Sequence, residues 1–306
     1  MHEALKLELV EKFQSVVGPD AVFVDEPMSE HTTFAIGGPA DILVRPATAE
    51  QIAAVVAACR AADAEVRIIG LGSDLLVSDD GLRCVVVELA DNFSAIRVKG
   101  TRVVAQAGAS NAAVAAAACE AGLAGYEFAS GIPGTVGGAA IMNAGAYGGE
   151  FKDCAISLTC LDERGELVSV SADEADWSYR HSMMDAAGYV VVDATLELTP
   201  DSREAIQDRM DDLRTRREEK QPLEMPSAGS TFKRPEGYFA GKLIQDAGLR
   251  GYRVGGAQVS EKHTGFVVNA GGATASDVCR LISDVQECVF EMEGVRLEPE
   301  VRMWGM

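Results

Sequence analysis

The spacing of hydrophobic and polar residues predicts a chain in which helices and strands alternate. Residues 3–17 read as an opening helix, and residues 52–59 carry apolar side chains at helical spacing behind a capping box of Thr48 and Gln51. Short apolar runs predict buried strands at 41–45, 66–69 and 82–89. Strand, helix and strand in this order indicate an α/β arrangement.

Irregular segments, hairpins and a polar helix are predicted around these elements. Residues 20–40 lack a clear period and contain the turn signal Gly37-Gly38-Pro39, so we expect irregular structure there. The charges of residues 201–220 recur at helical spacing, which is typical of a solvated helix face. The other expected elements are hairpins at 95–107 and 155–170, helices at 110–122, 241–247 and 274–292, and strands at 189–198, 264–269 and 294–304.

The stretch from Tyr126 to Glu150 fits neither a helix nor a strand pattern. It contains seven glycines among small and apolar residues, which is too many for a helix interior, and it lacks a strand's alternation. Such a segment lets the main chain come close to something large and flat. A cofactor with a phosphate tail is one interpretation, and a purely structural glycine-rich loop is the other.

A second glycine turn, Gly70-Leu71-Gly72-Ser73-Asp74-Leu75, directly follows a predicted strand. Main-chain N–H groups at such a turn can hold a pyrophosphate. It departs from the dinucleotide fingerprint because Leu75 stands where that motif has its third glycine, and no Gly-Lys-Ser/Thr follows as in a P-loop. Together the two glycine-rich stretches indicate one extended ligand held at two places.

Composition and charge limit the classes of partner. The chain has 306 residues and a net charge of −20, which argues against nucleic acid and anionic membrane as partners. No apolar run reaches the ~18 residues that span a bilayer, and the N-terminal segment does not read as a signal peptide. The seven cysteines form no CxxC motif, so we expect reduced, mostly buried thiols. The four histidines show no metal-binding spacing, and no metal site is expected.

Seven segments, in order, resemble the UDP-N-acetylenolpyruvoylglucosamine reductases (MurB), bacterial flavoenzymes of peptidoglycan precursor synthesis. The resemblance covers residues 30–303, and the region 227–244 is similar to the shorter, type II branch. The segments are TTFAIGGPAD, GLGSDLL, FASGIPGTVGGAAIMNAGAYGGE, YRHS, PSAGSTFKRP, FAGKLI and LEPEVRMWG.

The resemblance implies an α+β, FAD-binding fold of the vanillyl-alcohol-oxidase (PCMH) type, with two cofactor subdomains and a C-terminal α+β substrate-binding domain. We expect these at residues 1–92, 93–200 and 201–306. By resemblance, FAD is bound without a covalent link, because no flavin-linking His or Cys is evident in the turns. The implied cofactor residues are Gly70, Leu71, Gly72, Ser73, Asp74, Leu75, Ser130, Gly131, Ile132, Pro133, Gly134, Thr135, Gly138, Asn143 and Arg302. Asp74 stands where the family usually has Asn, which puts a carboxylate near the phosphates.

The family's reaction reduces UDP-N-acetylglucosamine enolpyruvate to UDP-N-acetylmuramate, with NADPH as the hydride donor and FAD as the carrier. Three positions match the family's catalytic residues. Arg180 would hold the substrate carboxylate, since a guanidinium binds carboxylates as a fork. Ser230 would donate the proton, and Glu300 would stabilise the intermediate with Arg180 or help deliver that proton. Without the resemblance, an ion-paired arginine, a turn serine and a solvated glutamate would be the plainer interpretations.

Four further residues are candidates for substrate binding: Tyr147, Lys233, Lys242 and His263. We expect a cytoplasmic enzyme without membrane insertion, and a monomer. The sequence leaves two alternatives: another FAD-dependent oxidoreductase of the same fold, or a non-catalytic FAD-binding protein. The matches at Arg180, Ser230 and Glu300, in three separate segments, argue against the second.

Overall fold

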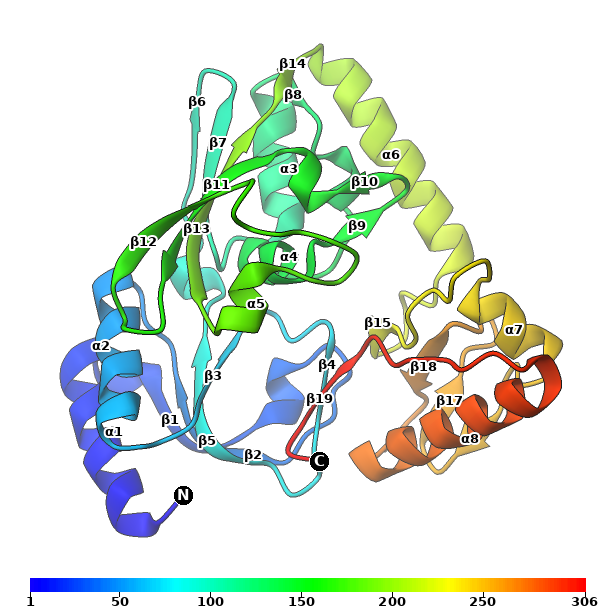
Figure 1. Cartoon of the computed structure of the whole chain (residues 1–306), viewed down its shortest axis with the longest axis horizontal. Helices are drawn as coiled ribbons and strands as arrows, with labels where there is room; N and C mark the ends of the chain where they lie inside the picture. The colour runs from blue at the N-terminus through cyan, green and yellow to red at the C-terminus, as the bar shows by residue number, and fades with distance from the viewer. The chain divides into compact units, whose positions relative to one another are not determined.

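The computed structural model describes all 306 residues, and Figure 1 labels most of its helices and strands. The chain divides into two compact units, each assembled from three separate segments. The first unit consists of Met1–Val24, Ile42–Leu71 and Cys84–Arg217, and the second of Asp25–Asp41, Gly72–Arg83 and Glu218–Met306. The domain limits at residues 92 and 200 stay a prediction.

A four-stranded sheet with the order β1-β2-β5-β3 is built from the N-terminal part of the chain. Its strands are β1 (Val22–Pro27), β2 (Pro39–Val44), β5 (Leu82–Glu88) and β3 (Val66–Ile69), with β3 parallel to β5. The helices α1 (Glu3–Val17) and α2 (Ala49–Ala61) bury their apolar stripes in the same hydrophobic core as these strands. The predicted strand–helix–strand order is therefore confirmed.

Two expectations about this region need correction. Residues 20–40 are not irregular throughout, because Val22–Pro27 forms β1; only Val22 is buried there, so the sequence shows no strand alternation. Thr48 caps α2 by accepting the Gln51 N–H at 3.2 Å. The side chain of Gln51, however, accepts the N–H of Ala47 at 2.7 Å, so the reciprocal bond of the capping box is displaced by one residue.

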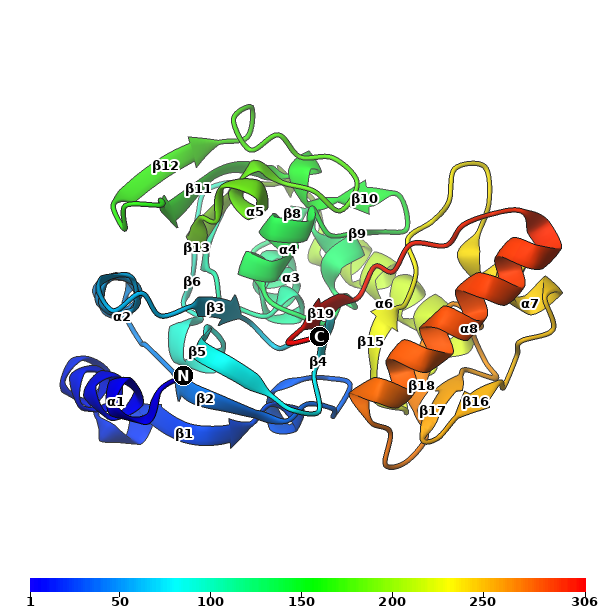
Figure 2. The same ribbon diagram turned by 60° about the horizontal axis from the view of Figure 1, so that its bottom comes forward.

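A five-stranded antiparallel sheet, order β12-β11-β13-β7-β6, forms the rest of the first unit's framework. The predicted hairpins are both present, and α3 (Asn111–Glu120) and α4 (Val136–Met142) pack against this sheet (Figure 2). Ser110 caps α3 by accepting the Ala113 N–H at 3.1 Å. The strands are β6 (Ile96–Lys99), β7 (Arg102–Gln106), β11 (Ala155–Leu161), β12 (Leu167–Ser171) and β13 (Val190–Glu197).

The expectation that residues 126–150 exclude a helix is wrong, because α4 lies within them. Gly137 explains how a glycine-rich helix is tolerated. A Cβ atom at Gly137 would lie only 2.9 Å from the Cβ of Ala107. The helix therefore needs glycine to pack closely on the end of β7, and this packing offsets the poor helix propensity of glycine.

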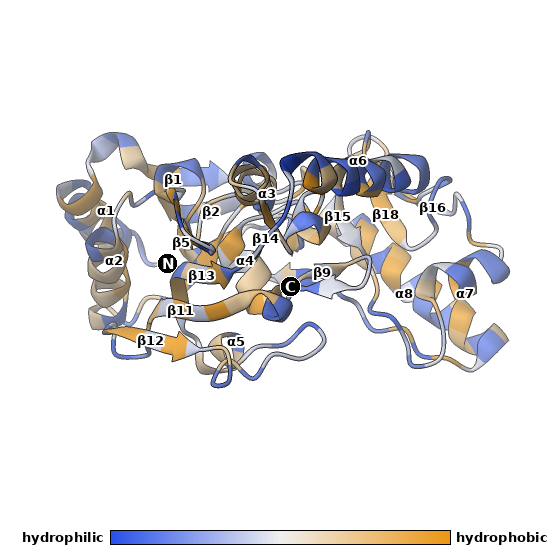
Figure 3. Cartoon of the chain, turned by 90° about the horizontal axis from the view of Figure 1, so that it is seen from above, coloured by the Kyte–Doolittle hydropathy of each residue, from blue (hydrophilic) through white to orange (hydrophobic).

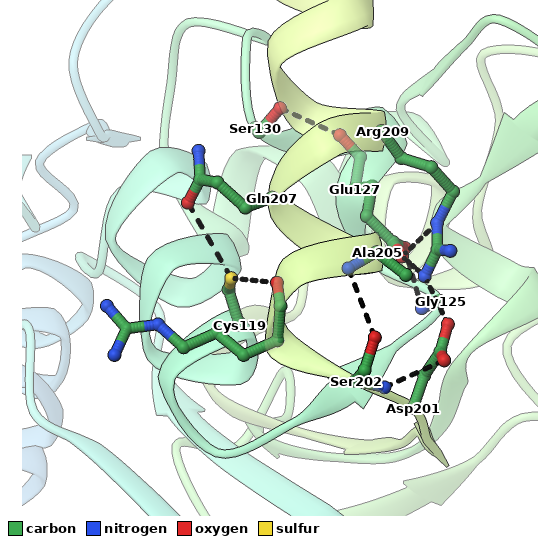
Figure 4. A network of polar contacts seen from close by, with 10 residues as sticks. Cys119, Gly125, Glu127, Ser130, Asp201, Ser202, Ala205, Gln207 and Arg209 are labelled. Carbon is green, nitrogen blue, oxygen red and sulfur yellow. Dashed lines mark hydrogen bonds and ion pairs between the residues drawn. The ribbon is translucent and has the colours of Figure 1, made fainter.

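The charge-rich helix α6 (Arg203–Lys220) is polar along most of its length, as Figure 3 shows, and only Ile206 and Arg217 are buried. The part up to Arg217 belongs to the first unit. Arg209 is central to that attachment, since it donates to Glu127 Oε1 at 2.7 Å and to Asp201 Oδ2 at 2.7 Å (Figure 4). Glu127 also accepts the Gly125 N–H at 2.7 Å, so the ion pair joins α6 to the segment before Ser130.

The second unit contains a four-stranded antiparallel sheet, order β15-β18-β17-β16, covered by two helices. The elements are β15 (Ser227–Ser230), β16 (Arg253–Val254), β17 (Ala257–Val259), β18 (Phe266–Asn269), α7 (Ala240–Asp246) and α8 (Ala275–Glu293). Thr274 and Asp277 form a complete capping box at the start of α8.

The C-terminal segment is a strand over only three residues, β19 (Arg302–Trp304), which pairs in parallel with β4 (Leu75–Val77). The predicted strand at 294–304 is therefore wrong before Arg302. Pro299 lacks an N–H and makes only an isolated bridge to Phe232. Consequently Glu298 and Glu300 do not share one face of a regular strand.

The cysteines are unpaired and mostly buried, and the helices are too short or too polar to cross a membrane. All seven cysteines are free, and five are buried, as the sequence predicts. Burial raises the pKa of the Cys59, Cys154 and Cys160 thiols to about 12, so these thiols are unreactive at neutral pH. None of the helices has the length and apolar character needed to cross a membrane.

Candidate functional site

The two glycine-rich stretches of the sequence meet in the first unit, at Gly70 and Thr135. A Cβ atom added to Gly70 would lie 2.3 Å from Thr135 Oγ1 and 2.8 Å from its Cγ2. Both distances are far below van der Waals contact, so glycine is required at position 70 by close packing. Thr135 is buried, and its hydroxyl accepts the Gly138 N–H at 3.4 Å and caps α4. The backbone at Gly70 is thus in close contact with the side chain of Thr135, some sixty residues later in the chain.

The loop Ser130–Thr135 is fixed by backbone contacts to the start of α3. The Asn111 N–H donates to the Gly134 carbonyl at 3.1 Å, and the Asn111 amide donates to the Ile132 carbonyl at 3.4 Å. Ser130 uses its hydroxyl on the Glu127 carbonyl at 2.8 Å. Within this anchored loop Gly131 and Pro133 stay exposed, which leaves one side of the loop open to a ligand.

Gly138 supplies a test of whether these residues fit a large flat cofactor. Gly137 is explained by its packing on Ala107, but Gly138 faces outward and a Cβ there would have only Thr135 Oγ1 within 4 Å, at 3.7 Å. Packing within the chain therefore gives no reason for glycine at position 138. A ligand that approaches the backbone closely would give one. The predicted cofactor segment fits such a group.

Arg217 of α6 is a residue of this region that the sequence interpretation missed. Its guanidinium donates to the Gly131 carbonyl and lies 5.6 Å from the ring centroid of Tyr147. The residue is only 8% exposed, and burial lowers its pKa although Tyr147 opposes the shift. A buried guanidinium with neutral partners holds the 130–135 loop in place. It is one of the two arginines in the segment TRREEK, which looks like a solvated helix face, so periodicity alone gives no signal for it.

The rest of the first turn, Gly72–Leu75, belongs to the second unit. Gly72 has φ +57°, and a Cβ there would lie 2.2 Å from the His31 carbonyl oxygen, so no other residue fits. The Arg302 N–H donates to the Asp74 carbonyl at 3.0 Å. Arg302 therefore lies beside the turn, and both were predicted to bind the cofactor. The contact of Asp74 and Arg302 with a cofactor stays a prediction.

Arg180 lies in the first unit, in a tight loop between Ser178 and His181, whose backbone N–H and C=O groups bond reciprocally at 3.3 and 3.2 Å. Its backbone is left-handed, with φ +55°, which costs a non-glycine residue about 1–2 kcal/mol. The guanidinium lies 4.8 Å from the ring centroid of Tyr179, close enough for a cation–π contact. A strained, well-defined loop thus presents the predicted catalytic arginine.

Ser230 and Glu300 lie on neighbouring segments of the second unit. Ser230 ends β15 and is exposed. The next residue, Thr231, donates its N–H to the Gly265 carbonyl at 2.9 Å and accepts the Glu300 N–H at 2.8 Å. The main-chain bond from Glu300 to Thr231 therefore holds the predicted carboxylate beside the residue that follows Ser230, the predicted proton donor. Their catalytic roles stay predictions.

The predicted substrate-binding residues are found in ordinary surroundings. Tyr147 is 45% exposed and has φ +54°. Lys233 lies 3.5 Å from Glu298, and Lys242 pairs with Asp246 within α7, both on the surface. Burial lowers the pKa of His263, whose ring accepts the Gly265 N–H at 3.2 Å. No cluster of three or more His, Cys, Asp or Glu could hold a metal ion. Substrate contact by these four residues stays a prediction.

Comparisons with known proteins agree on one family. The chain matches a family model described as "FAD binding domain" over residues 40–171. A second model, "UDP-N-acetylenolpyruvoylglucosamine reductase, C-terminal domain", matches residues 221–304. A UDP-N-acetylenolpyruvoylglucosamine reductase of Agathobacter rectalis is 57% identical over 295 residues, which cover 92% of this chain and 93% of the relative.

Solved structures support the same fold. The crystal structure of a UDP-N-acetylenolpyruvylglucosamine reductase from Thermus caldophilus matches with a TM-score of 0.80 and 36% identity, over 92% of this chain and 98% of that one. p-Cresol methylhydroxylase matches with a TM-score of 0.51 and 15% identity, over 66% of this chain and 44% of that one. The second likeness concerns the fold alone. The predicted α+β, FAD-binding fold of the vanillyl-alcohol-oxidase type is confirmed.

Proposed function

The chain belongs to the UDP-N-acetylenolpyruvoylglucosamine reductase family, and we propose that Arg180, Ser230 and Glu300 carry out the family's chemistry in it. The protein is an FAD-dependent oxidoreductase that uses NADPH to reduce UDP-N-acetylglucosamine enolpyruvate to UDP-N-acetylmuramate, in peptidoglycan precursor synthesis. The observation that carries this assignment is the 57% identity to a reductase of this name across 92% of the chain.

FAD, when bound, accepts hydride from NADPH and passes it to the substrate alkene. We propose that its binding residues come from Gly70–Leu75 and Ser130–Asn143, as the family resemblance implies. The support is the packing of Gly70 on Thr135 and the open face of Gly138. We further propose that the link is not covalent. Precipitating the protein with acid and recording the flavin absorbance of the supernatant tests this, because covalent flavin would stay in the pellet.

Arg180 holds the substrate carboxylate. Hydride addition to the terminal alkene carbon places negative charge on the adjacent carbon and on that carboxylate. A guanidinium remains charged at all relevant pH values and binds a carboxylate through two parallel N–H bonds. This interaction strengthens as charge develops, so it lowers the barrier as well as binding the ground state. The fixed loop between Ser178 and His181 supports the role.

Ser230 donates the proton that completes the reduction, and Glu300 assists it. A serine hydroxyl is a weak acid, so it serves only beside a strongly basic carbon and in a fixed position. Its support is the end of β15, which the neighbouring Thr231 ties to both Gly265 and the Glu300 segment. Ser230 is also exposed, as a group that must reach a substrate has to be.

The substrate-binding residues and the state of the protein in the cell complete the proposal. Tyr147, Lys233, Lys242 and His263 contact the sugar nucleotide, the lysines through its diphosphate. The enzyme acts in the cytoplasm, where NADPH and nucleotide sugars are made, and it acts as a monomer. Light scattering of the purified protein tests the last point, and a mass of twice the 32.3 kDa of the chain would contradict it.

The single experiment that tests the function separates the two half-reactions. The purified protein is loaded with FAD, and the loss of flavin absorbance on adding NADPH is followed first. The enolpyruvyl nucleotide is then added, and the return of absorbance is measured. A protein that reacts with NADPH but is not reoxidised by this substrate would be another oxidoreductase of the fold. A protein that cannot be loaded with FAD would contradict the proposal altogether.

A further inference from the structure

Asn143, at the C-terminal end of α4, is almost fully buried, and its side chain joins three segments of the first unit. Its exposed fraction is 1%. The amide nitrogen donates to Glu150 Oε2 at 2.9 Å and to the Ser178 carbonyl at 3.2 Å, while the amide oxygen accepts the Lys152 N–H at 3.0 Å. Both amide protons are therefore used, and one of them fixes the residue that begins the Arg180 loop.

Glu150 is the acid that orients this amide. Its carboxylate accepts from Asn143 and lies 2.8 Å from Lys152 Nζ. The hydrogen bond from Lys152 lowers the pKa of Glu150, burial opposes the shift, and Asn143 and the positive charge of Arg180 lower it further. The carboxylate is thus ionised at neutral pH and serves as an acceptor for the Asn143 amide.

The Arg180 loop needs such support because its own conformation is unfavourable. The left-handed backbone of Arg180, with φ +55°, is disfavoured for a side chain that carries a Cβ atom. The bridge between Ser178 and His181 closes the loop, and the bond from Asn143 to the Ser178 carbonyl fixes it to the end of α4. Removing the acceptor that orients Asn143 would release this anchor.

We propose that Glu150 is a positioning residue for Arg180, because through Asn143 it holds the Ser178–His181 loop that presents this arginine. This deepens the proposed function and rests on Arg180 being the residue that holds the substrate carboxylate. Glu150 itself does not contact the reacting atoms. The arrangement couples the glycine-rich helix of the predicted cofactor site to the predicted catalytic arginine.

Stopped-flow measurement of the two half-reactions tests the proposal with FAD-loaded protein. Glu150→Ala should slow the reoxidation by the enolpyruvyl nucleotide about 10- to 100-fold, the range that a small displacement of a catalytic group produces. Its reaction with NADPH should change less than twofold, because that step needs no contact with the substrate carboxylate. Glu150→Gln keeps an oxygen for the Asn143 amide and should recover most of the lost rate. Glu163→Gln, an exposed acid in the 162–166 turn, is the matched control and should behave like the unchanged protein.

Arg180→Ala, measured in the same way, separates the proposed role of Arg180 from the positioning role of Glu150. If it leaves reoxidation by the substrate unchanged, the proposed role of Arg180 fails. If it slows reoxidation and Glu150→Ala does not, the positioning role alone is wrong. Equal losses in both half-reactions of Glu150→Ala would indicate general damage to the fold. If Glu150→Ala and Glu150→Gln slowed reoxidation equally, the effect would come from the lost charge and not from the held loop. This result and general damage to the fold would each overturn the inference.

Discussion

Replacing Gly70 by Ala tests whether the two glycine-rich stretches act as one unit. The added Cβ would lie 2.3 Å from Thr135 Oγ1, 2.8 Å from its Cγ2 and 3.1 Å from its Cβ. Thr135 is 3% exposed and cannot rotate into solvent without giving up its bond to the Gly138 N–H. The substitution therefore forces the turn away from α4 or breaks the helix cap.

The size of the effect follows from three contributions. Overpacking of a closed site costs about 1–3 kcal/mol. Loss of a helix cap costs about 0.5–2 kcal/mol, and it adds only if Thr135 moves. Against these, Ala reduces the freedom of the unfolded chain and returns about 0.4–1 kcal/mol, because the backbone of Gly70 is not left-handed. We expect a net loss of about 1–2 kcal/mol in the free energy of unfolding, together with weaker FAD binding.

Urea denaturation of the FAD-free protein measures the loss of stability, and FAD titration measures the loss of affinity. Thr135→Ala is the second variant of a double-mutant cycle with Gly70→Ala. Thr135→Ala removes Oγ1 and Cγ2, leaving only the 3.1 Å contact. The double variant should therefore lose less stability than the sum of the two single variants, by about 1 kcal/mol. Strict additivity of the two losses would show that the two side chains do not compete for one space.

Three further predictions concern single residues. Gly138→Ala should stabilise the FAD-free protein by about 0.5–1 kcal/mol, because its Cβ meets nothing closer than 3.7 Å, yet it should weaken FAD binding; unchanged affinity in a titration would place the cofactor elsewhere. Ser230→Ala should react normally with NADPH but lose most product formation, measured by chromatography; failure of the NADPH step would remove the proton-donor role. Burial lowers the pKa of His263 from its usual 6.5. The unfolded state therefore binds the proton first, and the free energy of unfolding falls as pH drops below about 6.5. In urea denaturation His263→Gln should reduce this pH-dependent loss, and an unaltered pH profile would show that His263 contributes nothing to it.

Elements with a strong period were predicted correctly, and errors arose where tertiary packing decides. The helix α8 has both a capping box and an apolar stripe, so its limits agree with the prediction within about a residue at each end. By contrast, α4 has poor intrinsic propensity, and it forms because Gly137 lets it pack on Ala107. The strand β1 was missed because only Val22 of its six residues is buried.

The candidate site shows the same division. The motifs identify Gly70, Thr135, Arg180 and their neighbours as one family pattern, but periodicity contains no information on which segments meet. The packing of Gly70 on Thr135 is visible only in three dimensions. Arg217 was missed because it lies among seven other charged residues of similar spacing between 211 and 220, and only its burial distinguishes it.

Substrate-dependent consumption of NADPH is the decisive measurement for the assigned reaction. The FAD-loaded protein is mixed with NADPH and with increasing amounts of UDP-N-acetylglucosamine enolpyruvate, and both NADPH absorbance and the lactyl-ether product are measured. We expect NADPH oxidation to rise and saturate with the substrate, with one product formed for each NADPH consumed. NADPH oxidation at the same rate with and without the enolpyruvyl nucleotide, and no lactyl ether formed, would contradict the assigned reaction.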